Sequence, residues 1–188
     1  MEDAVQRTMV ERARDGDAAA FDALARAAAD RLMAIAYRIL RDVGRAEDAV
    51  QATLLQAWRQ LPGLRDPDRF DAWLHRILVH CCYAEARQAK EQRHEVTFLP
   101  IHEAPGADDL LTIAHRDQLE RGFRRLSPEH RAVVVLHHEL GLSGPEIAAQ
   151  LGIPLGTVKS RLHAATSALR AALEADARTS PTPRERTA

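Results

Sequence analysis

Two helical patterns near the C-terminus are separated by so few residues that their relative placement is narrowly limited. Ser143 and Glu146 match the S-x-x-E capping box that begins a helix, and Gly152 stands where that helix would end. Only Ile153 and Pro154 precede a second helical pattern. Its apolar residues recur every three or four positions, at Val158, Leu162, Ala165 and Leu169. Two helices joined by a short turn that contains Gly predict a helix-turn-helix.

The rest of the chain carries the same helical patterning. Of its 188 residues 46% are hydrophobic but only 4% aromatic, and the apolar residues are mostly Ala, Leu and Val, which favours helix over strand. Asp17 is placed as the N-cap of the first clear helix. The apolar stripe of that helix lies at Phe21, Leu24, Ala28, Leu32, Ile35 and Ile39. We expect an all-α fold of two small helical domains joined by a flexible linker, the second containing the helix-turn-helix.

Two further helices are expected in the N-terminal half. One runs from about Arg45 to Leu61 and would bury Val50, Leu54, Ala57 and Leu61. The next begins after Asp66 and Pro67, which suit an N-cap and a first helical position, and continues to about Arg93. Its buried stripe is expected at Phe70, Leu74, Ile77, Cys81 and Ala84.

Periodicity disappears after Arg93, where Pro100, Pro105 and Gly106 give the composition of a linker. We therefore expect a first domain at 1–93, a linker at 94–108, a second domain at 109–175 and a disordered tail at 176–188. Within the second domain a helix is expected at 108–126, followed by another from Ser127 to near Gly141. The run Val133–Val135 could be a strand, but a helix start and stop flank it without turn signals inside, so helix is favoured.

The formal charge excludes an overall basic protein, because 26 Lys and Arg face 27 Asp and Glu, for a net charge of -1. Contact with nucleic acid would require local positive charge. The stretch 154–173 provides it, with Lys159, Arg161 and Arg170 and no acid. A helix of this kind fits the DNA major groove. The alternative is an ordinary solvated helix, but the capping box, the tight turn and the acid-free face occur together, which favours DNA binding.

Three stretches of the C-terminal half resemble the domain of bacterial RNA polymerase sigma factors that reads the promoter −35 element. They are LSPE at 126–129, EIA at 146–148 and GTVKSRL at 156–162, and the extracytoplasmic-function group is the most similar. Output domains of LuxR-type regulators share parts of these motifs. The alternative is thus a LuxR-like helix-turn-helix regulator that acts without core polymerase.

The N-terminal half distinguishes a sigma factor from a LuxR-like regulator. AEDAVQ at 46–51, AWR at 57–59 and FDAWL at 70–74 resemble the sigma-factor region that docks on polymerase and melts the −10 element. A LuxR-type protein would carry a receiver or ligand-sensing domain there, with strands that this sequence lacks. Two motifs in the right order identify the chain as a member of the extracytoplasmic-function sigma factors, which implies that it binds core RNA polymerase and directs promoter-specific initiation.

The resemblance implies a polymerase-docking face on the helix at 45–61. Burial of its apolar stripe leaves a mixed polar and apolar surface outside, which suits a partner helix. The expected contacts are Asp48, Gln51, Leu55, Gln56 and Arg59. Trp58 is assigned to the core.

Single-stranded −10 DNA is expected at the loop before Phe70 and along the helix after it. The loop contributes the pocket that the family uses for its flipped base, while aromatic rings and cations recur along the helix every three or four residues, a combination suited to stacking bases and neutralising phosphates. The expected contacts are Leu64, Arg65, Asp66, Arg69, Trp73, Arg76, His80, Tyr83 and Arg87. Trp73 could equally belong to the core.

The −35 contacts are expected on the outward face of the last helix. Lys159, Ser160 and His163 are the candidates for base edges, with Thr157 beside them, and Arg161 and Arg170 are the candidates for phosphates. His80, Ala84, His163 and Ala164 depart from the residues that many relatives carry, so the resemblance does not fix the promoter sequences.

Other classes of function find no support in the sequence. His80-Cys81-Cys82 and His137-His138-Glu139 place neighbouring helical residues about 100° apart, where they cannot converge on one metal ion, and no nucleophile elbow or Gly-rich phosphate loop is present. No catalytic residue, metal or cofactor is expected. Cys81 is expected in the core and Cys82 as a partly exposed thiol; adjacent to each other, they indicate a reducing compartment.

Location and partners complete the expectation. No apolar run approaches the ~20 residues of a membrane helix, and no secretory signal is visible. We expect a cytoplasmic protein that is not membrane-inserted. Its expected partners are core RNA polymerase, promoter DNA and, since the family is commonly held inactive by one, an anti-sigma factor.

Overall fold

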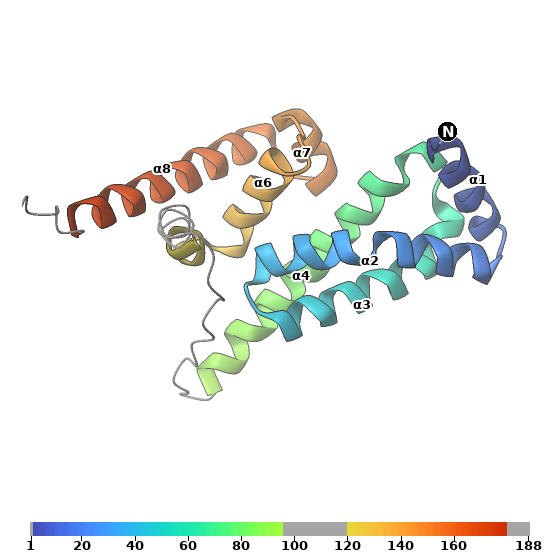
Figure 1. The fold of residues 1–188 in the computed structure, drawn as a ribbon, viewed down its shortest axis with the longest axis horizontal. Helices are drawn as coiled ribbons and strands as arrows, with labels where there is room; N and C mark the ends of the chain where they lie inside the picture. Colours follow the sequence, from blue (N-terminus) through green and yellow to red (C-terminus); the bar gives the residue numbers. More distant parts are fainter. Residues whose placement is uncertain (1, 96–119, 180–188) are drawn as a thin grey trace, which may run out of the picture.

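Helices make up all the regular structure that can be described. The structure, a computed structural model, describes residues 2–95 and 120–179, and within these ranges no strand occurs (Figure 1). The expectation of an all-α fold is confirmed. None of the helices in these ranges is long and apolar enough to cross a membrane.

The N-terminal group contains four α-helices and two short 3₁₀ turns. They are α1 (Glu2–Arg14), α2 (Ala18–Leu40), α3 (Val43–Gln60), η1 (Leu61–Gly63), η2 (Pro67–Arg69) and α4 (Phe70–Glu95). Helix α1 was not expected from the sequence. It packs on α2 and buries only Val10 and Ala13 fully, so its apolar pattern is too sparse to stand out.

Side-chain caps determine where these helices begin. The carboxylate of Asp17 accepts from the backbone N–H of Ala20 at 3.0 Å, as expected, and Asp42 accepts from that of Arg45 at 3.0 Å. Helix α3 therefore begins at Val43, two residues earlier than predicted. Between the two helices Arg41 takes a left-handed backbone conformation with φ 60°.

The predicted core stripe is correct for α2 and partly wrong for α3. Leu24, Ala28, Leu32, Ile35 and Ile39 are buried, with Phe21 partly buried. In α3 the fully buried positions are Ala46, Ala49, Thr53 and Ala57, whereas Val50 and Leu54 are only partly buried. Small side chains let α3 lie close to both α2 and α4. In α4 the stripe is confirmed except for Ala84, which is exposed.

The C-terminal group consists of helical residues 120–125 and of α6 (Pro128–His138), α7 (Gly144–Leu151) and α8 (Leu155–Thr179). Val133–Val135 are helical and buried, which confirms the preference for helix over strand. Residues 120–125 pack closely on α8. A Cβ added to Gly122 would lie 3.1 Å from both Ala172 Cβ and Leu169 Cδ2, so a larger residue there would push the helices apart.

The two groups lie against each other rather than apart (Figure 1). Helix α6 packs on α2 and α4, and α7 packs on α4. One continuous apolar cluster extends from the N-terminal helices to Leu136, Ile147 and Val158. Ion pairs join Arg38 to Glu139 and Arg41 to Glu120 across the boundary. The expected linker at 94–108 lies almost entirely outside the described residues, and so does the tail beyond Thr179; α8 itself continues past the expected domain end at 175.

Candidate nucleic-acid interface

The turn between α7 and α8 has the geometry that the sequence predicts. Ser143 caps α7 at the N–H of Glu146, and the Glu146 carboxylate accepts in return from the Ser143 N–H at 2.8 Å. These hydrogen bonds hold the pKa of Glu146 below its ordinary value. Gly152 ends the helix in a left-handed conformation with φ 66°. The capped helix α7 and the short turn after it therefore fix where α8 begins relative to α7.

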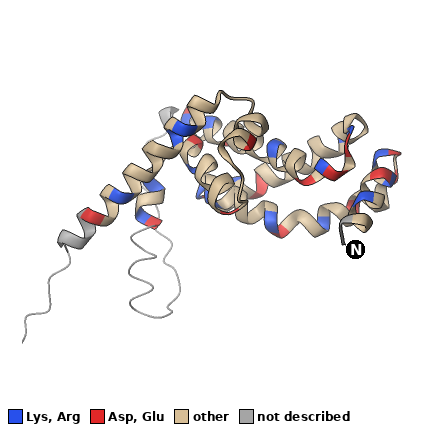
Figure 2. Cartoon of the chain, turned by 90° about the horizontal axis from the view of Figure 1, so that it is seen from above, with Lys and Arg blue, Asp and Glu red and all other residues tan. Residues whose placement is uncertain are grey.

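The outer face of α8 presents most of the predicted −35 residues to solvent. Lys159, Ser160, His163 and Arg170 are exposed. The Ser160 hydroxyl donates to the backbone carbonyl of Thr157 at 3.0 Å, and Thr157 is itself half-buried. Figure 2 shows α8 with basic segments along its length and an acidic one only near its far end. The structure thus brings these residues together on one positively charged surface.

Arg161 differs from its neighbours on α8 because it lies against the N-terminal group. It is half-buried and close to Tyr83 of α4 and Glu129 of α6. Burial raises the pKa of Tyr83 to about 12, and the nearby Arg161 opposes part of that rise. Burial would also raise the pKa of Glu129, but hydrogen bonds from Ser127 and the backbone, with Arg161 nearby, leave it below its ordinary value. Arg161 is therefore engaged with the protein itself.

The loop before α4 offers three of its four predicted −10 residues. Arg65, Asp66 and Arg69 are exposed; Asp66 caps η2 by accepting from the Asp68 N–H at 3.1 Å and lies 3.5 Å from Arg69 Nε. Leu64 is buried in the main apolar cluster. Its expected exposure was wrong, because the loop needs an apolar anchor between two 3₁₀ turns.

The predicted stripe along α4 divides into free and covered positions. Arg76, His80 and Arg87 are exposed; partial desolvation of the His80 ring, with Arg76 nearby, lowers its pKa. Trp73 is half-buried, with its ring 5.9 Å from that of Phe70, and Tyr83 is half-buried too. A Cβ added to Gly152 of the turn would lie 3.8 Å from Arg76 Nη2. The turn before α8 thus lies over part of this stripe.

The predicted polymerase-docking residues lie on one open surface of α3. Asp48, Gln51, Leu55, Gln56 and Arg59 are all exposed, Leu55 by 55%. Trp58 was expected in the core but stays 38% exposed, with its ring 5.0 Å from that of Phe21. The small residues Ala46, Ala49, Thr53 and Ala57, spaced by three and four, are the signal that would have placed Leu55 and Trp58 outside together.

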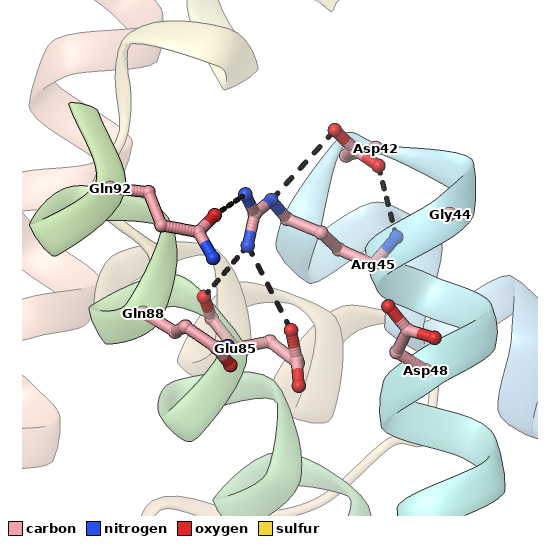
Figure 3. Close-up of a pocket in the computed structure, with 7 residues that line it drawn as sticks. All are labelled: Asp42, Gly44, Arg45, Asp48, Glu85, Gln88 and Gln92. Carbon is pink, nitrogen blue, oxygen red and sulfur yellow. Dashed lines mark hydrogen bonds and ion pairs between the residues drawn. The ribbon is translucent and has the colours of Figure 1, made fainter. Parts of the chain in front are cut away.

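A network around Arg45 fixes this surface to α4 (Figure 3). The Arg45 guanidinium donates to the Gln92 side chain at 2.9 Å and lies 3.8 Å from the Glu85 carboxylate. Asp48 lines the same polar hollow. The network joins the start of α3 to the C-terminal half of α4 and so limits how the docking face can shift.

Two buried groups lie behind these surfaces. Cys82 was expected to be partly exposed but is fully buried, and burial raises the pKa of its thiol to about 12, which leaves it unreactive. Burial lowers the pKa of His75 to about 4, with Arg31 adding to the effect and Asp71 opposing it. No group of His, Cys, Asp and Glu side chains suited to a metal ion occurs at 2–95 or 120–179.

Comparison with known proteins follows this division of the chain. Residues 24–92 match Sigma-70 region 2, and residues 116–169 match Sigma-70, region 4. The chain is 37% identical over 168 residues to the ECF RNA polymerase sigma factor SigL of Mycobacterium tuberculosis, covering 85% of this chain and 94% of SigL. The chain belongs to the ECF RNA polymerase sigma factors.

Other relatives agree. The ECF sigma factor SigE of Mycolicibacterium smegmatis is 36% identical over 163 residues, covering 82% of this chain and 63% of SigE. The solved structure of the sigma factor RpoE from Bartonella quintana, in complex with the anti-sigma factor NepR, is similar with a TM-score of 0.60 and 27% identity, covering 78% of this chain and 92% of RpoE. An ECF sigma factor directs transcription with RNA polymerase, and a LuxR-like regulator is not favoured.

Proposed function

We propose that this ECF sigma factor docks on core RNA polymerase through α3 and selects promoters through α4 and α8. The observation that carries the proposal is the exposed face of α8, which has no acid up to residue 173 and follows the capped helix α7 in a chain that also contains region 2. Its action is binding and strand separation without a covalent step, so it is not an enzyme. It works in the cytoplasm, where polymerase and promoters are found.

Helix α8 is proposed to read the −35 duplex. Lys159, Ser160 and His163 lie on its exposed face near its N-terminal end, where a recognition helix contacts base edges in the major groove. Arg170 lies further along the exposed face and suits a phosphate. Arg161 is assigned to a second phosphate once it leaves Tyr83.

The loop before α4 and the exposed side of α4 are proposed to hold the −10 strand. Arg65 and Arg69 flank Asp66 in the open loop, which can surround a flipped base. Arg76 and Arg87 continue as a basic track with His80 between them, and the rings of Trp73 and Tyr83 lie beside it for stacking. Leu64, being buried, supports the loop from within.

The polymerase contact is proposed for the α3 face that contains Asp48, Gln51, Leu55, Gln56 and Arg59. Leu55 supplies exposed apolar area, and the polar residues around it would form hydrogen bonds that orient the partner, as in a typical interface. We assign docking and −10 melting to a domain at 1–93 and −35 reading to one at 109–175. Polymerase would hold both at the right separation, which raises the effective concentration of each for its DNA element.

The packed arrangement of the two groups bears on regulation. Because α7 and Arg161 cover part of the α4 stripe, Tyr83 and Arg161 become fully available to DNA only when the groups separate. An anti-sigma factor, such as the one that binds RpoE of Bartonella quintana, would be a suitable partner if it bound this arrangement.

The proposal is tested by transcription in vitro with purified core polymerase across genomic promoters of the source organism. We expect promoter-specific transcripts and co-purification of the chain with core polymerase. Absence of both would refute the sigma-factor function. Promoter-specific DNA binding without any core contact would instead support a LuxR-like regulator.

A further inference from the structure

Helix α1 lies against the loop before α4, which is proposed to hold the −10 strand. It packs on both short turns of that loop, η1 and η2, as well as on α2 (Figure 1). Residues 24–92 match Sigma-70 region 2, so α1 precedes the matched stretch and the match gives it no role. Its position next to the loop suggests one.

Apolar contacts anchor α1 and the loop in the same core. Val10 and Ala13 of α1 are buried, and Met9 packs beside them. Leu61 and Leu64 of the loop belong to the same apolar cluster. Helix α1 is therefore a fixed element against which the loop can be held.

An ion pair fixes the end of α1 to the start of α2. The Arg12 guanidinium donates to the Asp17 carboxylate from Nε at 3.0 Å and from Nη2 at 2.6 Å. The same carboxylate caps α2. The direction of α1 is thus set by the helix that follows it.

From this fixed helix, Arg7 reaches the loop. Its Nη1 donates to the Asp68 carboxylate at 3.0 Å, while its Nε donates at 3.2 Å to Glu11, one turn further along α1. Asp68 lies between Asp66 and Arg69, two residues proposed for −10 contact, and its backbone N–H donates to the Asp66 carboxylate at 3.1 Å. Holding Asp68 in place therefore also limits where the Asp66 carboxylate can lie.

The other end of the loop is held in a similar way. Arg31 of α2 pairs with Asp71 in the first turn of α4 at 2.6 Å. Leu64 and Phe70 anchor the loop from below. Ion pairs from two different helices thus fix the loop on either side of its exposed residues. A loop already held in its bound shape loses less conformational entropy when it binds.

We propose that α1 fixes the shape of the −10 loop and that Arg7 is a positioning residue, acting through Asp68 on Asp66 and Arg69. The consequence for promoters rests on the proposed function of the loop. A pocket for a flipped base needs a fixed rim, whereas phosphate contacts tolerate movement. The side chains of Arg7 and Asp68 are 52% and 61% exposed, so their pair adds little to overall stability. Its effect is on discrimination between −10 sequences.

Hydrogen–deuterium exchange of the free, full-length chain tests the first step. The amides of Leu64, Asp68 and Arg69 donate within the loop, so their exchange reports how firmly the loop is held. Arg7→Glu should speed their exchange several-fold and leave the Tm almost unchanged. Adding Asp68→Arg, which restores an ion pair of opposite direction, should slow the exchange again.

The control for this test is Arg26→Glu. Arg26 is also exposed and pairs with a carboxylate four residues away, but its partner, Asp22, lies on the same helix. This variant makes the same change in charge and should leave loop exchange unchanged. Exchange at 64–69 that Arg7→Glu does not alter would overturn the proposal.

Binding by the holoenzyme tests the second step. The probes are a single strand that carries the −10 element of a promoter found by transcription in vitro, with 2-aminopurine beside the flipped base, and the same strand with that element scrambled. Arg7→Glu should lower the preference for the −10 strand about threefold to fivefold, and the added Asp68→Arg should restore it. Arg26→Glu should keep the preference of the wild type, and binding to core polymerase should stay unchanged throughout.

Two results of the binding test would overturn the role of Arg7. One is an equal loss of affinity for both strands in Arg7→Glu, which would show a simple effect of charge. The other is a preference that the added Asp68→Arg does not restore. Faster loop exchange in Arg7→Glu, with no −10 preference in the wild type, would support the role of α1 and refute the −10 assignment of the loop.

Discussion

Arg161 of α8 lies beside Tyr83 of α4, so a residue assigned to −35 phosphates meets one assigned to the −10 strand. On the proposed assignments, this contact keeps both side chains from DNA in the packed arrangement. We therefore expect the two helical groups to separate when the chain engages a promoter.

Reversing charge at the boundary between the groups should favour that separation. Glu139→Lys combined with Glu120→Lys replaces the ion pairs with Arg38 and Arg41 by two repulsive pairs. The Arg38–Glu139 pair lies at the surface and is worth about 0–1 kcal/mol, whereas Arg41 is mostly buried, so we expect at least a several-fold shift toward the separated form. Small-angle scattering should show a larger radius of gyration, and Glu11→Lys on α1 serves as the charge control. An unchanged radius in the double variant would contradict the role of these pairs.

Charge reversal on the recognition helix should affect promoter reading alone. Lys159→Glu places an acid on the exposed face of α8, so we expect at least about tenfold less initiation from −35-dependent promoters with unchanged binding to core polymerase. Transcription in vitro and a core-binding assay measure the two effects separately. Arg26→Glu controls for the change in net charge. Equal loss of both activities would count against the role of α8.

The capping box should contribute measurably to the stability of the helix-turn-helix. Ser143→Ala removes the hydroxyl that caps the Glu146 N–H and should cost about 1 kcal/mol in the free energy of unfolding. Urea unfolding followed by circular dichroism measures it, and −35 DNA affinity should fall in parallel. Ser167→Ala, at an exposed position within α8, should leave both unchanged or slightly improved. If the two variants behave alike, the cap does not organise the turn.

The buried His75 should make stability depend on pH. The pKa of His75 is about 4 in the folded chain and 6.5 in the unfolded chain, so between these pH values the unfolded chain binds a proton that the folded chain does not bind. The free energy of unfolding should therefore be highest above pH 6.5 and should fall by roughly 3 kcal/mol in total as the pH drops from 6.5 toward 4. His75→Leu should flatten unfolding free energy against pH in that window, whereas His138→Gln should not. A wild-type slope retained in His75→Leu would assign the pH dependence to other groups.

Removing apolar surface from α3 should weaken polymerase binding without unfolding the protein. Leu55 is 55% exposed, so Leu55→Ser should change the Tm little while reducing affinity for core polymerase several-fold. Surface plasmon resonance with immobilised core polymerase measures the affinity. The control is Val5→Ser, because Val5 is also apolar and is exposed to a similar extent, 57%, on α1. Equal losses for both variants would place the docking face elsewhere.

Signals confined to a few neighbouring residues predicted the fold well. The caps at Asp17 and Ser143 depend on one side chain and the next turn of backbone, and the sequence predicts each of them. The left-handed end of α7 at Gly152 is equally local. Helix type and order, and with them the turn before α8, follow from such signals.

Errors arose where tertiary packing decides. In α3 small residues face the core because close helix approach outweighs the burial of Val50 and Leu54, and this turns Trp58 outward. Leu64 and Cys82 are buried by neighbours distant in sequence. Helices α6 and α7 pack on α2 and α4 and cover Tyr83. The periodicity of one helix does not show which other helix will cover its face, so this contact could not be predicted from the sequence.

The left-handed backbone at Arg41 shows what the junction between α2 and α3 must preserve. Glycine occupies that conformation freely, whereas arginine there is strained by about 1 kcal/mol. Arg41→Gly would relax the backbone and, in the same change, remove the link to Glu120. The junction between α2 and α3 therefore carries local backbone strain together with a side chain that reaches the other helical group.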